Sequence, residues 1–345
     1  MRSGFTVTEV GRKLPSSMPL QRDYGTKRMK LCFKKGFLFY AEYNIRLFLF
    51  LLFHHADLIF ANDLDTLAAA WTAKRIKKCD LIYDSHEYYT QTPELINRKF
   101  VQKFWTRIEK NIFPKITDVI TVNESIAAIY HKKYGNPVHV VRNIPPERKI
   151  TNPLTRDQLH IATDKNMILM QGAGINIQRG AEEAVEAMKY VENAVLYIIG
   201  GGDVFPLLPA LVEQHQIQNK VVILPKQTPE VLRNYTLLAD LGLSVDKDTN
   251  LNYRYSLPNK LFDYIHSQVP IIASHLPEIE RIITEYKIGD FIPDHNPVHI
   301  AQVINNALSN KKRYQSWKDN LQKAADQLNW PEEEKVLLTI FEKYA

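Results

Sequence analysis

Short apolar runs alternate along this chain with stretches in which apolar residues recur at helical spacing. The runs that we interpret as strands cover, in chain order, residues 57–62, 80–84, 118–122, 167–171, 195–199, 221–224, 241–245 and 269–273. After the last run the pattern is mostly helical and ends with a helix at residues 330–345. Buried parallel strands are near-continuous apolar runs separated by helices, so the pattern predicts an α/β fold with parallel sheets.

The alternation breaks once, near the middle of the chain. It stops around Val141, a polar stretch follows, and a new series opens at Met167. A chain of 345 residues also exceeds what one hydrophobic core usually organises. We therefore predict two Rossmann-like domains, at residues 1–150 and 160–328, with the boundary between them near residues 147–162.

The predicted first domain looks incomplete at its start. A doubly wound domain ordinarily opens with a strand, a glycine-bearing turn and a helix. This chain instead opens at residues 4–10, which resemble a second strand. We expect the first strand and helix of that domain to be missing from the sequence.

Basic residues crowd residues 12–35, where Asp23 is the single acid. The basic residues are Arg12, Lys13, Arg22, Lys27, Arg28, Lys30, Lys34 and Lys35. A Phe- and Leu-rich run follows at residues 37–53, too short and too polar to predict a membrane span. One interpretation, which we favour because charge runs are usually solvated, is a buried amphipathic helix behind a basic loop. The other is a patch that binds an anionic membrane surface.

Composition narrows the setting of the protein. Cys32 and Cys79 are isolated, which argues against a disulfide framework or thiolate metal site and favours a reducing compartment. Residues 1–3 lead into a polar run, so no secretory signal is predicted. We therefore expect a cytoplasmic protein. The net charge is only +6, and we expect no nucleic-acid partner. The protein would lie on the inner face of the plasma membrane if the lipid-binding interpretation holds.

A glycine-bearing turn follows the first strand of the second half. Gly172 and Gly174 end that strand, and Arg179 and Gly180 then open a helix. Helix N-terminal N–H groups and the donor fork of an Arg suit a diphosphate. Ile177 replaces the third glycine of a dinucleotide fingerprint, so a nicotinamide dehydrogenase is disfavoured. Alternatively, these glycines are simple turn residues.

A second turn of the same kind follows the next strand. Gly200 and Gly202 end it, and Phe205 again stands where a fingerprint glycine would be. Open α/β sheets bind ligands at the carboxyl ends of their strands, so this backbone is a candidate to approach a nucleotide. Alternatively, these glycines only allow the backbone conformation of a turn and contact no ligand.

Residues 255–265 form the clearest candidate site. The segment begins with Tyr255, Ser256, Leu257, Pro258 and Asn259. Pro258 suits a helix start, so that the nearby amides face a ligand, Lys260 neutralises phosphate and Asp263 accepts ribose hydroxyls. Alternatively, Lys260 is a solvated helix residue and Asp263 is an acid that complements the helix dipole.

Together these segments resemble the family 4 glycosyltransferases of the GT-B fold, in particular bacterial members with a Pro-Asn-Lys-Leu-Phe-Glu/Asp-Tyr segment. The resemblance covers essentially the whole chain. It is carried by residues 62–66, 83–87, 121–124, 142–145, 178–180, 200–203, 258–264 and the terminal helix with Trp330.

The resemblance implies two facing Rossmann-like domains, with residues 329–345 packing back on the first. It implies a retaining, metal-independent and cofactor-free transfer of a hexose-type sugar. The donor would be a nucleotide-diphosphate sugar and the acceptor a glycan or a lipid-linked molecule.

The resemblance also assigns roles to individual residues. Arg179 matches the family's cationic residue at the first helix of the donor domain, and Asp263 matches the second acid of its Glu-x7-Glu motif. The first acid falls on Tyr255, which supplies no carboxylate beside the transferred sugar. His86 matches a histidine near the donor sugar, and Glu87 is a weaker candidate for an acceptor contact. We expect His86, Arg179 and Lys260 to take part in catalysis.

An Asp-x-Asp pair offers a rival interpretation. Asp63 and Asp65 have the spacing that holds a divalent cation in transferases of another fold. The pair is remote in sequence from the phosphate-binding signals, so we expect no metal site. We interpret one or other of these acids as a cap of the following helix, with Asp63 a weak acceptor-side candidate.

Two other functions remain open. A nucleotide-sugar epimerase can share this double fold and needs no acceptor. The second open function is that of a degenerate, non-catalytic protein that binds a nucleotide sugar. Its best support is Tyr255, which stands where the family has an acid.

Overall fold

The computed structural model describes residues 4–15, 17, 19–146 and 150–345. Its contacts divide the chain into two units, Met1–Arg142 with Glu333–Ala345, and Asn143–Glu332. Residues 1–3, on which the prediction of no secretory signal rests, and residues 147–149, within the predicted boundary, lie outside the described residues.

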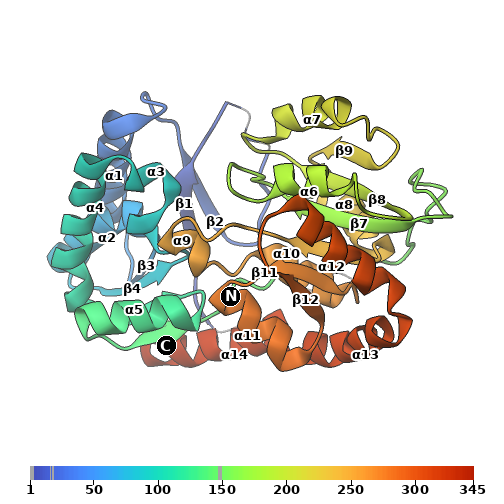
Figure 1. Ribbon diagram of the computed structural model, residues 1–345. Helices are drawn as coiled ribbons and strands as arrows, with labels where there is room; N and C mark the ends of the chain where they lie inside the picture. The colour runs from blue at the N-terminus through green and yellow to red at the C-terminus, as the bar shows by residue number, and fades with distance from the viewer. Residues whose placement is uncertain (1–3, 16, 18, 147–149) are drawn as a thin grey trace. The chain divides into compact units, whose positions relative to one another are not determined.

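The first unit is built on a four-stranded parallel sheet in the order β3-β4-β5-β6. Its strands are β3 (Leu58–Asn62), β4 (Asp80–Ser85), β5 (Asp118–Thr121) and β6 (Val138–Val140). Its main helices are α1 (Gly36–Phe53), α2 (Leu64–Lys77), α4 (Lys99–Ile112) and α5 (Glu124–Tyr134), with the short α3 (Pro93–Ile96) before α4. Helices α1, α2 and α4 lie together on one side of this unit (Figure 1).

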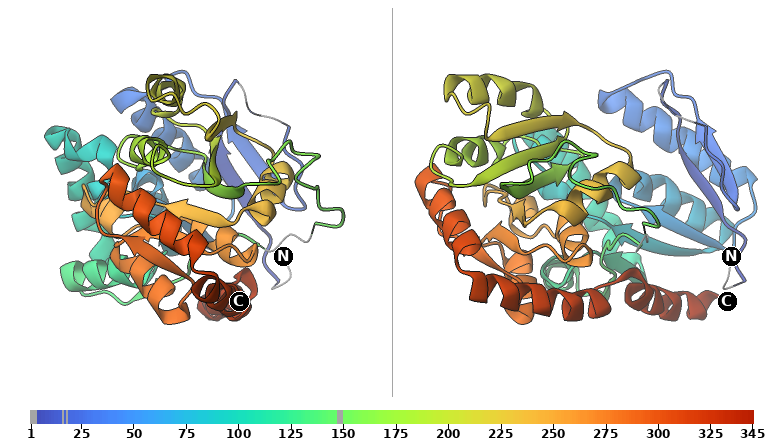
Figure 2. Two further views of the ribbon diagram at one scale, coloured as in Figure 1. Left: turned by 45° about the vertical axis from the view of Figure 1, so that its right-hand side comes forward. Right: turned by 90° about the vertical axis from the view of Figure 1, so that its right-hand side faces the viewer.

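Two further strands of the first unit form a separate parallel pair. They are β1 (Thr8–Arg12) and β2 (Gly25–Met29). Tyr43 and Leu47 of α1 pack with Val10 and Leu31, at this pair, and with Ala69 of α2. Helix α1 therefore lies between the strand pair and α2, and Figure 2 shows it beside the pair.

The favoured interpretation of residues 37–53 as a buried helix is wrong. These residues do form a helix, α1, but only Tyr43 and Leu47 are buried. Within the described residues, α1 is the one helix long and apolar enough to cross a membrane, with a mean hydropathy of 1.4 and 11% of its 18 residues buried. The periodicity predicted the helix correctly and its environment incorrectly, because apolar residues occupy both faces.

The second unit is a six-stranded parallel sheet in the order β12-β11-β10-β7-β8-β9. Its strands are β7 (Asn166–Gly172), β8 (Ala194–Gly200), β9 (Val221–Pro225), β10 (Leu241–Ser244), β11 (Ile271–Ser274) and β12 (Gly289–Ile292). Its helices are α6 (Ala181–Ala187), α7 (Leu208–Gln214), α8 (Pro229–Leu238), α9 (Leu251–Arg254), α10 (Asn259–His266), α11 (Pro277–Tyr286), α12 (Pro297–Ser309) and α13 (Lys311–Gln327). Counted along the chain, this is the 3-2-1-4-5-6 strand order of a dinucleotide-binding Rossmann sheet.

Apolar side chains cover both faces of this sheet. Along β7, Ile168 and Met170 pack in one core cluster, whereas Met167 and Leu169 pack in another. Successive side chains of a strand point to opposite faces, so a strand covered by helices on both faces is apolar throughout. The uninterrupted apolar runs of the sequence have this origin.

Local signals explain where several helices begin. The side chains of Asn123, Thr228 and Asn296 accept hydrogen bonds from backbone N–H groups in the first turns of α5, α8 and α12. Proline occupies the first turn of α8 and α12, where its missing N–H costs no hydrogen bond.

The structure confirms all eight strands predicted from apolar runs, as β3, β4, β5, β7, β8, β9, β10 and β11. The strand expected at residues 4–10 begins only at Thr8. Strands β2, β6 and β12 were not predicted. Strand β2 is mostly polar, β6 has only three residues, and β12 begins with Gly289 and Asp290 and has no apolar run.

The end of the chain is bound to the first unit by buried acids. Helix α14 (Trp330–Phe341) carries Glu333, which is 3% exposed. Its carboxylate accepts hydrogen bonds from the backbone N–H of Arg142, at 2.6 Å, and from Nε of Arg142, at 2.7 Å. Near the C-terminus, Lys343 and Tyr344 donate to the carboxylate of Asp118. These bonds fix residues 333–345 against β5 and the end of β6.

Replacing Glu333 tests this attachment. Glu333→Gln keeps the shape but removes the charge opposite Arg142, and charged hydrogen bonds contribute about 1.5–3 kcal/mol each. We expect the opening free energy of residues 138–142 to fall by about 2 kcal/mol, measured by native-state hydrogen exchange. Glu342→Gln, at an exposed position of the same segment, is the control. Equal protection in the two variants would contradict the prediction.

Candidate functional site

Three charged residues of the second unit meet at the carboxyl ends of β7 and β10. These strands are neighbours at the point where the strand order reverses. Open α/β sheets bind ligands in the crevice at this point. Arg179 lies in the connection from β7 to α6, Asp246 follows β10, and Lys260 lies in the first turn of α10.

Asp246 is the centre of this cluster. Its side chain has no exposed surface, and its Oδ1 accepts a hydrogen bond from Nη1 of Arg179 at 2.9 Å. Nζ of Lys260 lies 3.1 Å from Oδ2. The side chains of Arg179 and Lys260 keep 25% and 12% of their surfaces exposed. Both cations therefore share one buried anion and still reach solvent.

The electrostatics of the cluster follow from this geometry. Burial raises the pKa of Asp246, but the charges of Lys260 and Arg179 and their hydrogen bonds outweigh burial and lower that pKa below its ordinary value. Burial lowers the pKa of Arg179, but Asp246 outweighs it and the pKa is raised. Asp246 and Arg179 are thus both charged at neutral pH. Two cations against one carboxylate leave the cluster positive.

Further groups at the same strand ends are polar or aromatic. The guanidinium of Arg179 lies over the ring of Tyr253, 4.2 Å from its centroid. Several buried polar atoms in the part of the chain that the structure describes lack a hydrogen-bond partner, and three of them lie here: Nε of Arg179, Oγ of Ser244 and Oδ2 of Asp246. Buried polar atoms are rarely left unpaired in native proteins, so these atoms favour a polar ligand here.

Two of the predicted glycines, Gly180 and Gly202, allow close contact between backbone segments at these strand ends. A Cβ on Gly180, where φ is +75°, would lie 2.2 Å from the carbonyl oxygen of Val245. A Cβ on Gly202 would lie 2.3 Å from the carbonyl oxygen of Ile175. The N–H of Ile175 donates to the carbonyl of Gly201 at 2.6 Å. The turn after β7 therefore rests directly on the turn after β8.

The remaining glycines of the prediction differ in how tightly they are packed. A Cβ on Gly200 would lie 1.8 Å from the carbonyl oxygen of Gly172. A Cβ on Gly172 or Gly174 would approach other atoms no closer than 3.5 and 3.6 Å. Close backbone approach explains Gly200, whereas Gly172 and Gly174 have room for a small side chain.

The predicted segment at residues 255–259 links α9 to α10. Tyr255 ends α9, and the guanidinium of Arg254 lies 5.9 Å from the centroid of its ring. Ser256 donates through Oγ to the carbonyl of Tyr253 at 2.9 Å. Leu257 packs against the core, Pro258 stands at the N-cap of α10, and Asn259 is the exposed first residue of that helix.

Asp263 joins a buried network at the end of β7. Its Oδ2 accepts a hydrogen bond from Nε2 of Gln171 at 2.9 Å, and Oε1 of Gln171 accepts from Thr236 at 2.7 Å. Burial raises the pKa of Asp263, although the bond from Gln171 lowers it. The carboxylate therefore has a partner within the protein.

His86, in the first unit, lies between two carboxylates. Its Nε2 is 2.9 Å from Oδ2 of Asp84, and its Nδ1 is 3.4 Å from Oδ2 of Asp63. The hydrogen bonds to Asp63 and Asp84 raise the pKa of His86 to about 10, against the opposing effect of burial. Both ring nitrogens are occupied, and the imidazolium is the dominant form at neutral pH. A contact between His86 and a sugar requires one of these partners to be exchanged.

The interpretation of Asp63 or Asp65 as the cap of the following helix is correct for the position of Asp63 but not for its hydrogen bonds. Asp63 stands at the N-cap of α2, but no side chain caps that helix. The carboxylate of Asp63 accepts the backbone N–H of His86 at 3.0 Å instead. Burial, with the charge of Asp63, raises the pKa of Asp65 to about 6. The carbonyl of Glu87 accepts from Ser85 at 2.9 Å, and its side chain is half-buried.

Over the described ranges, no group of three or more His, Cys, Asp or Glu side chains is arranged to hold a metal ion. Cys32 is exposed, Cys79 is buried, and both are free thiols.

Sequence reasoning missed Asp246, Gln171 and Tyr253. Asp246 carried one usable signal, since it is a charged residue directly after a buried strand of an α/β sheet. Gln171 and Tyr253 carried none, because their contacts join segments far apart in the sequence.

Two Rossmann-like units, built on parallel sheets, give the chain the fold of the GT-B class. Residues 152–324 match the model of the family described as glycosyl transferases group 1, and residues 1–144 match that of glycosyltransferase family 4. The chain belongs to the group 1 glycosyl transferases and is a glycosyltransferase. None of the curated protein sequences matches it.

Solved structures show the same fold. Sucrose-phosphate synthase from Thermosynechococcus elongatus is similar with a TM-score of 0.80 and 16% identity, over 99% of this chain and 89% of that one. The Anabaena protein HepE, in complex with UDP, gives 0.73 and 14% over 92% and 86%. A glycosyltransferase from Rickettsia africae gives 0.73 and 13% over 93% and 85%.

The charge on His86 predicts a pH dependence of stability. Its pKa is raised from 6.5 to about 10, so its contribution to stability is fully present below pH 6.5 and is lost as the pH rises towards 10. We expect the difference in unfolding free energy between wild type and His86→Asn to shrink over this range, as measured by chemical denaturation. With 45% of the side chain exposed, solvent reduces the size of this difference.

His160→Asn is the matched control for this measurement. His160 is exposed, and its backbone is left-handed, with φ of +54°, a conformation that Asn also adopts. The prediction fails if the His86→Asn difference stays constant across this pH range, or if His160→Asn gives the same pH-dependent difference.

Proposed function

We propose that this glycosyltransferase moves a hexose-type sugar from a nucleotide-diphosphate sugar to a glycan or lipid-linked acceptor, with retention and without a metal. The observation that carries the proposal is the convergence of Arg179 and Lys260 on buried Asp246 at the switch point of the second sheet. A positive, partly exposed site at this position suits the diphosphate of the donor.

The cations of this cluster can stabilise the diphosphate leaving group of the donor. As the glycosidic bond of the donor breaks, negative charge grows on the diphosphate. Asp246 holds Arg179 and Lys260 in place before the reaction, so they stabilise that charge with little reorganisation. Two fixed cations thus do the work that a divalent ion does in other phosphate chemistry. This is the basis for proposing a metal-independent reaction.

A uridine nucleotide is the first donor to test. The Anabaena protein HepE has been solved in complex with UDP, with UDP and glucose, and with UDP-glucose. Those ligands belong to that protein. They support UDP and UDP-glucose as probes for the site around Arg179.

Other parts of the proposal rest on the resemblance of the sequence to its family. Retention is one of them, and we name no nucleophile, because the sequence offers no acid whose position supports a covalent intermediate. The contacts of Asp263 with ribose and of His86 with the donor sugar are proposals of the same kind. The two free thiols support a reducing, cytoplasmic setting.

Acceptor-dependent turnover tests the function. The protein is incubated with UDP-glucose, alone and with soluble glycans or vesicles of hydroxyl-bearing lipids, and all products are identified by mass spectrometry. Sugar transfer that requires an acceptor is the expected result. An altered UDP-sugar formed without acceptor would identify an epimerase and overturn the proposal. Binding of UDP-glucose without turnover on any acceptor would favour a non-catalytic binding protein.

Removing Arg179 tests the donor site separately. We expect Arg179→Ala to weaken UDP binding by about 10- to 100-fold in calorimetry, the factor that corresponds to a lost charged hydrogen bond. Arg179→Lys should lose less affinity, because it keeps the charge but not the donor fork.

Arg313→Ala is the control for this substitution. Arg313 forms an ion pair of similar length with Asp290, at 2.7 Å, but lies on α13 rather than at the strand ends. Unchanged UDP affinity in Arg179→Ala, or an equal loss in Arg313→Ala, would remove Arg179 from the site.

A further inference from the structure

Basic residues gather where β1 and β2 end. Arg12 is the last residue of β1 and Lys13 follows it, whereas Lys30 directly follows β2. The two strands are parallel and in register, so their carboxyl ends lie level with each other. The chain then continues through exposed Lys34 and Lys35 into α1. We call Arg12, Lys13, Lys30, Lys34 and Lys35 the basic cluster.

The guanidinium of Arg12 is held in one place. Its Nη2 donates to the carbonyl of Lys34 at 3.0 Å, and its Cζ lies 4.5 Å from the centroid of the Phe39 ring. Neither contact involves an acid. A planar guanidinium fixed in this way keeps other N–H donors for a ligand and loses little freedom when a ligand binds.

The cations of the basic cluster have no acidic partners. Over residues 4–15, 17, 19–146 and 150–345, none of the five forms an ion pair. Asp23 precedes β2, at the other end of the strand pair. Glu9 lies three positions before Arg12 on β1, so the two side chains point to opposite faces. Glu42 accepts two backbone N–H groups and pairs with Arg46 at 2.8 Å. The basic cluster is therefore strongly positive.

The contacts of α1 place the basic cluster at the same edge of the first unit as His86. Asn44 donates to the carbonyl of Asp65 at 2.8 Å, and Lys77 donates to the carbonyl of Leu51 at 3.0 Å. Helices α1 and α2 therefore run in the same direction. Since α2 begins where β3 ends, α1 also begins at the carboxyl ends of the strands. His86, which follows β4, lies at that edge, where α/β sheets bind ligands.

Aromatic contacts join the first turns of α1 to the same edge. The ring centroid of Trp105, on α4, lies 5.2 Å from that of Tyr40, on α1, and 5.6 Å from that of Tyr89. Tyr89 stands three residues after His86 in the sequence. The segment after β4 and the start of α1 therefore pack against one side chain.

The spacing along α1 sets the size of a ligand that reaches both places. Gly36, the first residue of α1, lies about 12 Å along the helix axis from Asn44, at 1.5 Å per residue. Asn44 is bonded to Asp65, whose carboxyl is close enough to Asp63 to be affected by its charge. Asp63 is in turn a partner of His86. A ligand that contacts both His86 and the basic cluster must therefore be longer than one sugar ring.

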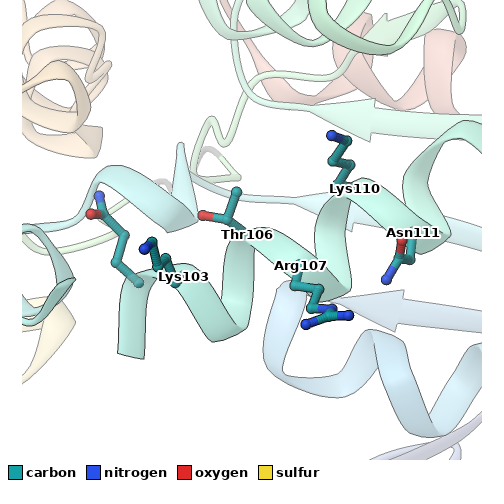
Figure 3. Close-up of a pocket in the computed structure, with 6 residues that line it drawn as sticks. Lys103, Thr106, Arg107, Lys110 and Asn111 are labelled. Carbon is teal, nitrogen blue, oxygen red and sulfur yellow. The ribbon is translucent and has the colours of Figure 1, made fainter. Parts of the chain in front are cut away.

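A second group of cations in this unit lacks one feature of the basic cluster. Lys103, Arg107 and Lys110 line a shallow hollow on α4, where Figure 3 shows their side chains. The hollow is lined by residues 102–111 of that helix, whose backbone N–H groups bond within it. By contrast, the first turn of α1 contains no acid and has no side-chain cap. Its N–H groups add to the positive potential of the basic cluster.

We propose that the basic cluster binds a phosphate group of the acceptor, carried on a different sugar residue from the one that receives the transferred sugar. This inference rests on the proposed function. Five cations beside a helix start suit the two negative charges of a phosphate better than the single charge of a carboxylate. The phosphate is either a substituent of a glycan or the group that joins a glycan to a lipid, and its chemistry at the basic cluster is the same.

Calorimetry with the full chain tests the basic cluster without any nucleotide sugar. The probes are maltotriose, maltotriose 1-phosphate, and the same trisaccharide joined through a diphosphate to a short prenyl chain. We expect both phosphorylated probes to bind at least tenfold more tightly than maltotriose. Tighter binding of the prenyl probe would identify a lipid-linked acceptor, and equal binding of the two a phosphorylated glycan.

Substitutions in the basic cluster should weaken this binding. We expect Arg12→Gln to weaken maltotriose 1-phosphate binding about tenfold, the factor that corresponds to a lost charged hydrogen bond. Lys35→Ala should weaken it about threefold, because exposed ion pairs contribute less. Lys110→Ala, which removes an exposed cation in the last turn of α4, is the charge control and should bind as wild type does. Circular dichroism checks that each variant folds.

The free thiols report where the probe binds. Cys32 is exposed and lies between Lys30 and Lys34 in the sequence, whereas Cys79 is buried and serves as the internal reference. We expect maltotriose 1-phosphate to slow the alkylation of Cys32 by iodoacetamide severalfold, as measured by mass spectrometry. Maltotriose should not slow it, and Arg12→Gln should abolish the protection.

Several results would overturn the proposal. They are equal binding of maltotriose and its phosphate, an equal loss in Lys110→Ala, or binding that leaves the alkylation of Cys32 unchanged. Binding that only Arg179→Ala weakens would place the probe in the donor site instead. Sedimentation with phosphatidylglycerol vesicles without binding of either phosphorylated probe would assign the basic cluster to a membrane surface.

Failure of this inference is distinguishable from failure of the proposed function. Sugar transfer to neutral glycans, with no gain from a phosphate on the acceptor, would contradict only the role of the basic cluster. A phosphate bound at the basic cluster, with no transfer to any acceptor, would contradict only the proposed function.

Discussion

A buried carboxylate organises the candidate site of the second unit. Ionised Asp246 has no exposed surface, and an unpaired charge in such a place costs several kcal/mol. Arg179 and Lys260 remove that cost from two directions, one from the turn after β7 and the other from the start of α10. Arg179 and Lys260, which are far apart in the sequence, are thereby held next to the same carboxylate. The same contacts hold two cations where the sheet offers its crevice.

The sequence was most informative where burial and periodicity coincide. Runs such as residues 167–171 and 195–199 predicted strands correctly, because strands covered on both faces by helices must be apolar at every position. Once these strands were placed, parallel topology brought Arg179 and Lys260 to the same edge of the sheet. The order of the strands was enough to expect that Arg179 and Lys260 lie close together. It did not show that Asp246 lies between them.

What the sequence did not predict depends on tertiary contacts. The pairing of Arg179 with Asp246 spans 67 residues and leaves no local pattern. Asp63 has the sequence of a helix cap, yet His86 offers it a stronger, charged partner. Apolar periodicity in α1 predicted burial, but only the side of the helix with Tyr43 and Leu47 packs against the strand pair and α2, and apolar residues on its other side are exposed. Strand β2 was not predicted, because a strand that is mostly exposed has no apolar run in its sequence.

The interlocked turns after β7 and β8 have a consequence for protein engineering. Gly180, Gly200 and Gly202 each have the backbone of another segment where a Cβ would be, so libraries that vary them would mostly sample misfolded chains. Gly174 has room for a small side chain, and Ile177 is 58% exposed in the same turn. If the proposed function holds, variation of this turn is best begun at these two positions, where the structure leaves room for other side chains.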